Sequence, residues 1–242
     1  MFRGRDGKLN PYILLIILMV ASRFLRGGVS DPVAWLVDRL IMLPGIILGL
    51  SLHEFGHAIV STKLGDPTPR SQGRVTVNPI AHIDPVGMLT LVFAGFGWGV
   101  PVQIDPSYYK HRRRDEALVA VAGVSMNLVI VVLTTVALRF IVHMVPGSAM
   151  GSTVGGVFLE ILQDIILVNI VLMFFNLLPV PPLDGFNLVT QIFDLSKYSW
   201  YIPLYRNGFI ILILLIMLNF TGVILNPLVS GVFKLCYSFI IG

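Results

Sequence analysis

Long apolar runs alternate with short polar segments along this chain. Six of the runs are predicted to be membrane-spanning helices: residues 11–25, 35–62, 116–145, 155–178, 203–220 and 223–241. Because an α-helix rises about 1.5 Å per residue, about 20 apolar residues are needed to cross a hydrocarbon core of about 30 Å. The pattern therefore predicts one transmembrane domain, residues 1–242, of all-α polytopic architecture. The short first run should tilt little or thin the bilayer locally.

The longest connection between the runs, residues 64–115, has a different pattern. Residues 74–77 and 101–104 alternate between apolar and polar side chains, as short β-strands do. Between them, residues 86–100 are apolar and glycine-rich but too few for a confident span. We therefore expect a small membrane-associated β-like or re-entrant element between the second and third helices, where protein or water can surround non-helical backbone.

Composition supports an integral membrane protein. The chain is 55% hydrophobic and 12% charged, with a mean hydropathy of +0.85, whereas soluble domains are about 25% charged. The net charge of +4 comes from basic residues that flank the apolar runs, as expected for topology signals and contact with anionic lipid. We therefore expect the lipid bilayer as a partner and no nucleic acid. The single cysteine, Cys236, excludes an intrachain disulfide and a cysteine-rich zinc module.

Basic residues also predict the orientation. Placing the N-terminus in the cytoplasm puts 12 of the 17 Lys and Arg residues on that side, in the N-terminal tail, the connection that begins at Lys63, and residues 186–206. Cytoplasmic loops of membrane proteins are enriched in such residues. We expect a multi-pass protein of the cell membrane with both termini cytoplasmic. No small-residue cleavage site follows the first run, which favours a retained span over a signal peptide.

Residues 53–57, His-Glu-Phe-Gly-His, place two imidazoles and a carboxylate inside the second apolar run. Ionisable side chains are costly at membrane depth and usually functional there. On a helix, His53 and His57 lie one turn apart on one face and can bind one Zn²⁺, while Glu54 can act as general base toward a water molecule at the metal. An open N/N/O site suits zinc best, although other divalent metals can fit.

A catalytic zinc needs a third protein ligand, and two acidic candidates follow along the chain. The first is Glu160 with Asp164, at a spacing that resembles soluble thermolysin-like enzymes, and the second is Asp184. Glu160 should lie about 27 Å from the inner end of its helix, whereas the histidines lie roughly 10–15 Å from the inner end of theirs. Asp184 directly follows the inner end, after prolines that stop the helix. Depth therefore favours Asp184, and Glu160 is read as a carboxylate near a helix N-terminus.

Two asparagines are candidates for contact with substrate. Asn127 should lie about 16 Å into the third helix, level with the histidines, where it could hydrogen-bond a substrate carbonyl or stabilise an oxyanion. Asn176 stands at the end of the fourth helix and is a similar candidate. The alternative for Asn127 is a hydrogen bond between helices, and for Asn176 it is helix packing or a turn cap. His82 is expected to hydrogen-bond within a local turn.

Together these motifs resemble the site-2 protease family of intramembrane metalloproteases. The residues that carry the resemblance are 53–57, 73–79, 82–85, Asn176, Pro179 and 181–185. The similarity extends over about three-fifths of the chain, and one departure is Val124, where the family usually has proline. The chain resembles a minimal member, without an inserted PDZ domain or a nucleotide-sensing domain.

The resemblance implies an intramembrane zinc endopeptidase, acting in regulated intramembrane proteolysis. It would hydrolyse a peptide bond in or near a transmembrane segment of a membrane-protein substrate. One Zn²⁺ per chain would be held by His53, His57 and Asp184, with Glu54 as the catalytic base. The rival interpretations are a metal-transporting protein and a catalytically silent relative with the same buried site. The intact Glu54 and the scarcity of other ionisable residues in the apolar runs argue against both.

Overall fold

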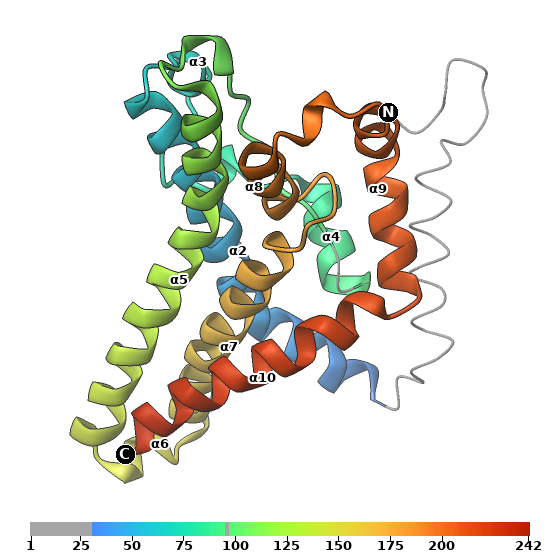
Figure 1. Ribbon diagram of the computed structural model, residues 1–242. Coiled ribbons are helices and arrows are strands. Elements are labelled where there is room, and N and C mark those ends of the chain that lie inside the picture. The colour runs from blue at the N-terminus through green and yellow to red at the C-terminus, as the bar shows by residue number, and fades with distance from the viewer. Residues whose placement is uncertain (1–30, 95–96) are drawn as a thin grey trace.

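The computed structural model describes residues 31–94 and 97–242, and these residues form a helical bundle without strands (Figure 1). The elements in chain order are α2 Pro32–Lys63, α3 Thr68–Ser71, η1 Pro79–Ala81, α4 Pro85–Ala94, η2 Pro106–Tyr108, α5 Arg112–Met144, α6 Gly147–Met150, α7 Thr153–Asn176, α8 Asp184–Phe193, η3 Leu195–Lys197, α9 Tyr201–Met217 and α10 Phe220–Ile241. This confirms the all-α prediction.

Four of the six predicted spans appear as helices long and apolar enough to cross a membrane. They are α2, α5, α7 and α10. The predicted span at 203–220 is α9, an apolar helix of 17 residues, which is shorter than the roughly 20 residues that a crossing needs. The predicted span at 11–25 lies outside the described residues. Length and composition therefore support four candidate spans in the described part of the chain.

The connection between α2 and α5 does not contain the two predicted strands. Within its described residues, the only strand-like pairing is an isolated antiparallel bridge between Ile83 and Gly99. Residues 74–77 and 101–104 have no neighbouring strand with which to pair their backbones, so alternation alone did not produce a sheet. Most of the apolar segment predicted as β-like or re-entrant is helix α4, and its re-entrant course stays a prediction.

The core of the bundle is the packing of α2, α5 and α7 (Figure 1). Asp31 caps α2 by accepting hydrogen bonds from the backbone N–H groups of Val33 and Ala34 at 2.9 and 3.0 Å, as short polar N-cap residues do. Farther along α2, a Cβ on Gly56 would lie 2.8 Å from the carbonyl oxygen of Ala122 in α5. Glycine thus lets the two backbones come close, a common device where membrane helices pack.

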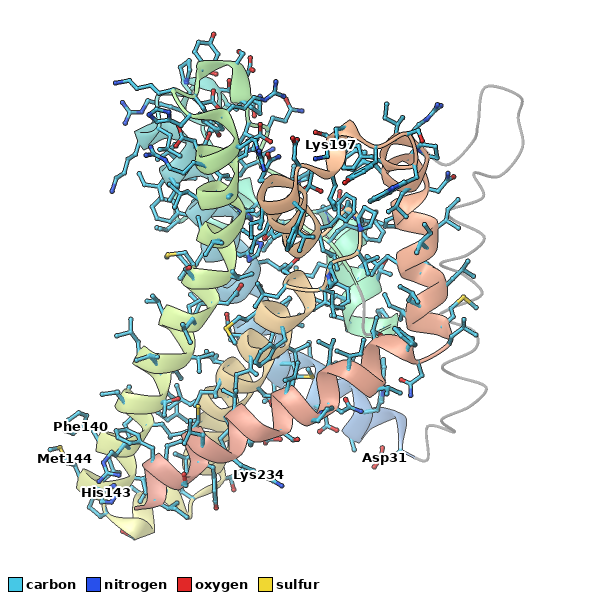
Figure 2. All side chains as sticks on the ribbon, viewed as in Figure 1. Asp31, Phe140, His143, Met144, Lys197 and Lys234 are labelled. Carbon is cyan, nitrogen blue, oxygen red and sulfur yellow. The ribbon has the colours of Figure 1, made fainter. Side chains whose placement is uncertain are left out.

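α10 packs against α5 and α7, and α9 precedes it along the chain. The C-terminal end of α10 lies at the far end of α5, where Arg139 donates a hydrogen bond to the Phe239 carbonyl and its guanidinium lies 4.8 Å from the Phe239 ring centroid. Figure 1 shows the C-terminus beside α6, at the opposite end of the bundle from α3 and α8. In Figure 2, His143 and Lys234 lie toward that end, whereas Lys197 lies toward the other.

The C-terminus thus lies at the other end of the bundle from α3, while the cytoplasmic location of both termini stays a prediction. The chain breaks at Asn219, which has a left-handed backbone with φ of 57°. After the break, α10 continues obliquely in the direction away from α8 rather than turning back (Figure 1). The break at Asn219 thus separates α9 from α10, and of these two helices α10 alone is long and apolar enough to cross a membrane.

Asp66 fixes the start of the connection against the end of α2. Its carboxylate is fully buried and accepts hydrogen bonds from the Ser61 hydroxyl at 2.8 Å and from the backbone N–H groups of Thr68 and Asp105 at 2.9 and 2.8 Å. Burial alone would raise the pKa of Asp66, but these hydrogen bonds favour the charged form and hold the pKa below its ordinary value. The segment that ends at Asp105 is thereby tied to α2.

We expect Asp66→Ala to lower the free energy of unfolding by about 3 kcal/mol, because three buried donors lose a charged acceptor. Asp38→Ala, at an exposed position of α2, is the control and should change stability by less than about 0.5 kcal/mol. The pKa of Asp66 is lower in the folded state than in the unfolded state. The stabilisation by its carboxylate is therefore fully present above about pH 4, the unfolded-state pKa, and is lost as the pH falls through the folded-state pKa. Thermal unfolding in detergent at pH 7 and at acid pH measures both effects. Equal melting temperatures of the two variants at pH 7 would contradict this role.

Candidate metal centre

Three ligand atoms from two distant parts of the chain converge at one point. His53 and His57 lie one turn apart on α2, and Asp184 is the first residue of α8. The two Nε2 atoms are 3.1 Å apart, and Asp184 Oδ2 lies 3.1 Å from that of His53 and 3.2 Å from that of His57. Within the described residues, these three side chains are the only group of His, Cys, Asp and Glu with metal-ligand spacing. Glu160 and Asp164 are not part of it.

The geometry of this triangle fits a zinc ion. Zinc binds nitrogen and oxygen ligands at about 2.0–2.1 Å, which places the ligand atoms of a tetrahedral site about 3.3 Å apart. The observed separations of 3.1 to 3.2 Å are within about 0.2 Å of that value. Asp184 Oδ2 is buried and has no hydrogen-bond partner among the described residues, as expected for an oxygen that binds a cation.

The hydrogen bonds of the two Nδ1 atoms, on the side of each imidazole away from Asp184, also fit a metal site. His57 Nδ1 lies 2.8 Å from the carbonyl oxygen of Val119, and His53 Nδ1 lies 2.8 Å from Asn127 Oδ1. An oxygen of either kind can only accept, so Nδ1 carries the proton in each ring. In the neutral rings both Nε2 atoms then present lone pairs toward each other and toward the Asp184 carboxylate. Such a cluster of lone pairs is repulsive by itself, and a metal cation among them relieves the repulsion.

Gly123 of α5 leaves the space that this cluster needs. A Cβ at that position would lie 2.5 Å from His57 Nε2 and 2.7 Å from His53 Nε2. Any side chain on residue 123 would therefore collide with the ligand nitrogens.

Glu54 and the ligands line one cavity of about 570 Å³. Glu54 Oε2 accepts a hydrogen bond from the backbone N–H of Val102 at 3.0 Å, which holds the carboxylate beside the metal ligands. The other polar side chains that line the cavity are Glu116, Asn176, Asn187, Gln191, Tyr201 and Tyr205. The cavity thus combines a metal-ligand set, a carboxylate and polar groups that could hold a polypeptide.

The two asparagines predicted to contact substrate lie in different places. Asn176 lines the cavity, and its amide donates to the Leu172 carbonyl of its own helix at 3.0 Å. Asn127 is fully buried behind His53, and both polar atoms of its amide are hydrogen-bonded within the bundle. The alternative of a hydrogen bond between helices therefore describes Asn127 better than contact with substrate.

Several residues of the site were not identified from the sequence. Asn169 of α7 hydrogen-bonds Asn127 at 3.0 Å, and Gln191 of α8 donates to Glu116 of α5 at 2.6 Å. A polar residue within an apolar run was a usable signal for Asn169, since such residues usually have a partner. The Gln191 contact depends on the way α8 folds back and had no sequence signal. His82 bonds the Thr76 carbonyl at 2.8 Å, which confirms the expected local turn.

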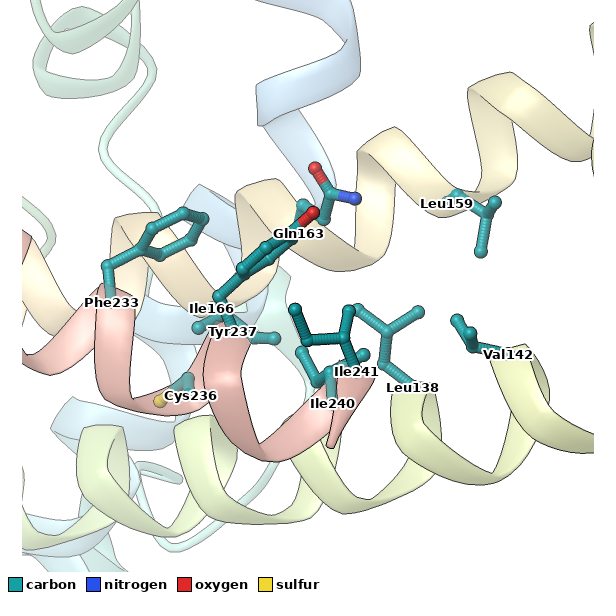
Figure 3. Close-up of a pocket in the computed structure, with 10 residues that line it drawn as sticks. All are labelled: Leu138, Val142, Leu159, Gln163, Ile166, Phe233, Cys236, Tyr237, Ile240 and Ile241. Atoms are coloured by element: carbon teal, nitrogen blue, oxygen red, sulfur yellow. The ribbon is translucent and has the colours of Figure 1, made fainter.

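A second pocket, of about 190 Å³, lies between α5, α7 and α10 (Figure 3). Its lining is mostly apolar and includes Leu138, Ile166 and Ile240, with Gln163 and Tyr237 as the larger polar side chains. It contains neither a ligand of the proposed metal nor a carboxylate, so it is not a candidate for the chemistry.

A helix-borne His-Glu-x-x-His motif, a carboxylate placed as a candidate third ligand and a bundle of apolar helices are typical of a membrane metalloprotease. Residues 41–218 match the family model described as Peptidase family M50. The chain belongs to this family of zinc metalloproteases, the site-2 protease family, as its sequence motifs predicted.

Curated relatives agree with this assignment. The chain is 33% identical over 190 residues to "Putative zinc metalloprotease YwhC" of Bacillus subtilis, which covers 77% of this chain and 84% of that protein. It is 28% identical over 218 residues to "Putative zinc metalloprotease Rip2" of Mycolicibacterium smegmatis, covering 86% of this chain and 80% of the relative. No solved structure gives a significant match.

The ligand assignment predicts the metal content of purified protein. Wild type should contain about one zinc per chain, Asp184→Ala should lose it, and Glu160→Ala should keep it, because Glu160 lies outside the ligand group. Elemental analysis after gel filtration measures the ratio. Zinc that persists in Asp184→Ala, or disappears in Glu160→Ala, would refute the assignment.

Gly123→Ala should weaken zinc binding at least tenfold, since the added methyl group displaces the ligand nitrogens. Alanine favours helix more than glycine does, so α5 itself should remain helical by circular dichroism. Gly156→Ala in α7 is the matched control, because a Cβ there meets no atom within 4 Å. Unchanged zinc affinity in Gly123→Ala, measured by competition with a chelator, would show that the cluster is not the metal site.

Proposed function

We propose that this protein is an intramembrane endopeptidase that hydrolyses a peptide bond in or near a transmembrane segment of another membrane protein, as in regulated intramembrane proteolysis. The observation that carries the proposal is the convergence of His53, His57 and Asp184 beside Glu54 in one cavity. Two of these ligands lie within α2, about 9–15 Å from its end, which suits a substrate bond at shallow membrane depth.

The chemistry divides between the metal and the side chains. When bound, Zn²⁺ polarises the scissile carbonyl and makes a water molecule more acidic. Glu54 accepts a proton from the attacking water and delivers it to the amine of the leaving peptide. The N–H of Val102 keeps the Glu54 carboxylate oriented toward the cavity. Asn176, on the cavity wall, is proposed to hydrogen-bond the substrate backbone.

The segment at 100–105 is the proposed docking edge for the substrate. Its Pro101, Val102 and Ile104 line the cavity, and Asp66 ties its end to α2. Within the described residues, the backbone N–H groups of Gln103 and Ile104 donate no hydrogen bond. A helical substrate hides its carbonyl groups, so it has to unwind before hydrolysis. Pairing its extended backbone with this segment would satisfy groups that lipid cannot.

We also propose that the end of the bundle with α3 and α8 faces the cytoplasm of a cell-membrane protein. Basic residues from Lys110 to Arg114 and the exposed aromatic side chains of Tyr198 and Trp200 lie at this end. Basic residues mark cytoplasmic loops, and Trp and Tyr are enriched at membrane interfaces.

Glu54→Gln tests the proteolytic function. The variant should retain zinc but lose at least about 100-fold in cleavage rate, because glutamine cannot accept the proton from water. Both proteins would be reconstituted in liposomes with designed single-span substrates whose helices carry glycine or asparagine near the cytoplasmic end. Products would be identified by mass spectrometry.

Two other outcomes would contradict parts of this proposal. Cleavage by Glu54→Gln at the wild-type rate would eliminate Glu54 as the base. Zinc-loaded wild type that cleaves none of the substrates but moves zinc across the liposome membrane would favour the transport function.

A further inference from the structure

We propose that Asn169 is a positioning residue for the metal centre, acting through Asn127 on His53. The inference rests on the proposed metal site and assigns it a support from α7, a helix that supplies no ligand. Both asparagines are fully buried in the bundle. They form a chain of hydrogen bonds from the α7 backbone to the imidazole of His53. We name this hydrogen-bonded chain of Asn169, Asn127 and His53 the amide relay.

The relay begins at carbonyl groups that can only accept. Asn169 Nδ2 lies 2.8 Å from the Ile165 carbonyl oxygen and 3.5 Å from that of Gly45. If the Asn169 amide were turned over, its own oxygen would face these two oxygens. The amide nitrogen therefore has to occupy this position, and Asn169 Oδ1 has to face Asn127.

The next two links follow from the first. Asn127 Nδ2 donates to Asn169 Oδ1 at 3.0 Å and to the Gly49 carbonyl at 3.3 Å. With its nitrogen so placed, Asn127 presents Oδ1 to His53 Nδ1 at 2.8 Å. His53 Nδ1 is then the protonated nitrogen, and Nε2 keeps the lone pair that a metal needs. Asn169 thus fixes the tautomer of a ligand that it does not touch.

The packing of α2 on α7 brings these groups within reach of one another. A Cβ on Gly49 would lie 2.9 Å from Asn169 Oδ1, and one on Gly45 would lie 3.1 Å from the Asp164 carbonyl oxygen. Gly45, Gly49, His53 and His57 recur at intervals of four residues, so they lie along one face of α2. The same face therefore admits α7 with its glycines and holds the metal with its histidines.

Asn169→Leu and Asn169→Asp separate positioning from helix packing. Leucine has a similar size but cannot accept from Asn127, so the zinc dissociation constant should rise about tenfold or more, as for other residues that orient metal ligands. A protonated aspartate keeps an oxygen toward Asn127 and a hydroxyl donor toward the Ile165 carbonyl, so at a pH where this buried carboxyl is neutral the dissociation constant should stay within about threefold of wild type. Competition with a chelator in detergent measures both values. Thr135→Val, at a buried position of α5, controls for general loss of stability.

Two further readouts report on the relay itself. In protein with ¹⁵N-labelled histidine, Asn169→Leu should alter the His53 ring resonances of the metal-free state toward a mixture of tautomers, whereas Thr135→Val should not. The double variant of Asn127→Leu with Asn169→Leu should bind zinc no more weakly than Asn127→Leu alone, because the two residues act in one chain.

The outcomes distinguish this inference from the proposed function. Wild type that binds no zinc would overturn the metal site and the relay together. Wild type that binds zinc, with an unchanged dissociation constant and unchanged His53 resonances in Asn169→Leu, would overturn the relay alone. Equal losses in Asn169→Leu, Asn169→Asp and Thr135→Val would also overturn it, since they would show a packing role.

Discussion

In an apolar environment every polar group has to find its partner within the protein, and this constraint underlies the whole site. Two imidazoles and a carboxylate are placed with their ligand atoms converging, an arrangement that a bound metal cation stabilises. On their far sides, the imidazoles bond a backbone carbonyl of α5 and the amide of Asn127. The bundle therefore supplies acceptors behind the rings and leaves the space in front of them for the metal.

The central helix α2 meets this constraint because its glycines and histidines lie on one face and its Glu54 lies on another. One face carries glycines that admit α7 and, one and two turns farther on, the histidines. Glu54 lies off that face and meets Val102 of the connection. Because Asp66 ties this connection to the end of the same helix, the metal ligands, the base and the proposed substrate edge are all positioned relative to α2. Rigid attachment to one element is what a preorganised active site requires.

The residues that converge in the candidate site could be predicted where they depend on spacing within one helix or on chain breaks. His53, Glu54 and His57 are recognisable because the i, i+4 spacing places both imidazoles on one face, and the prolines before Asp184 predict that the chain can return to the bundle. Depth along a helix also separated Asp184 from Glu160 without knowledge of the fold. The apolar runs predicted α2, α5, α7 and α10 because length and hydropathy are local properties.

Features that depend on contacts between distant elements were not predictable in the same way. Alternation at 74–77 predicted a strand, yet a strand needs a partner, and the chain supplies none there within its described residues. The oblique course of α10 after the left-handed break at Asn219 was not predictable either, because an apolar run predicts the length of a helix and not its direction. Asn127 was recognised at the correct depth, but its role depended on Asn169, a residue 42 positions away. Depth can identify which residues share a layer of the bundle, whereas the direction of each amide follows only from the backbone carbonyls that surround it.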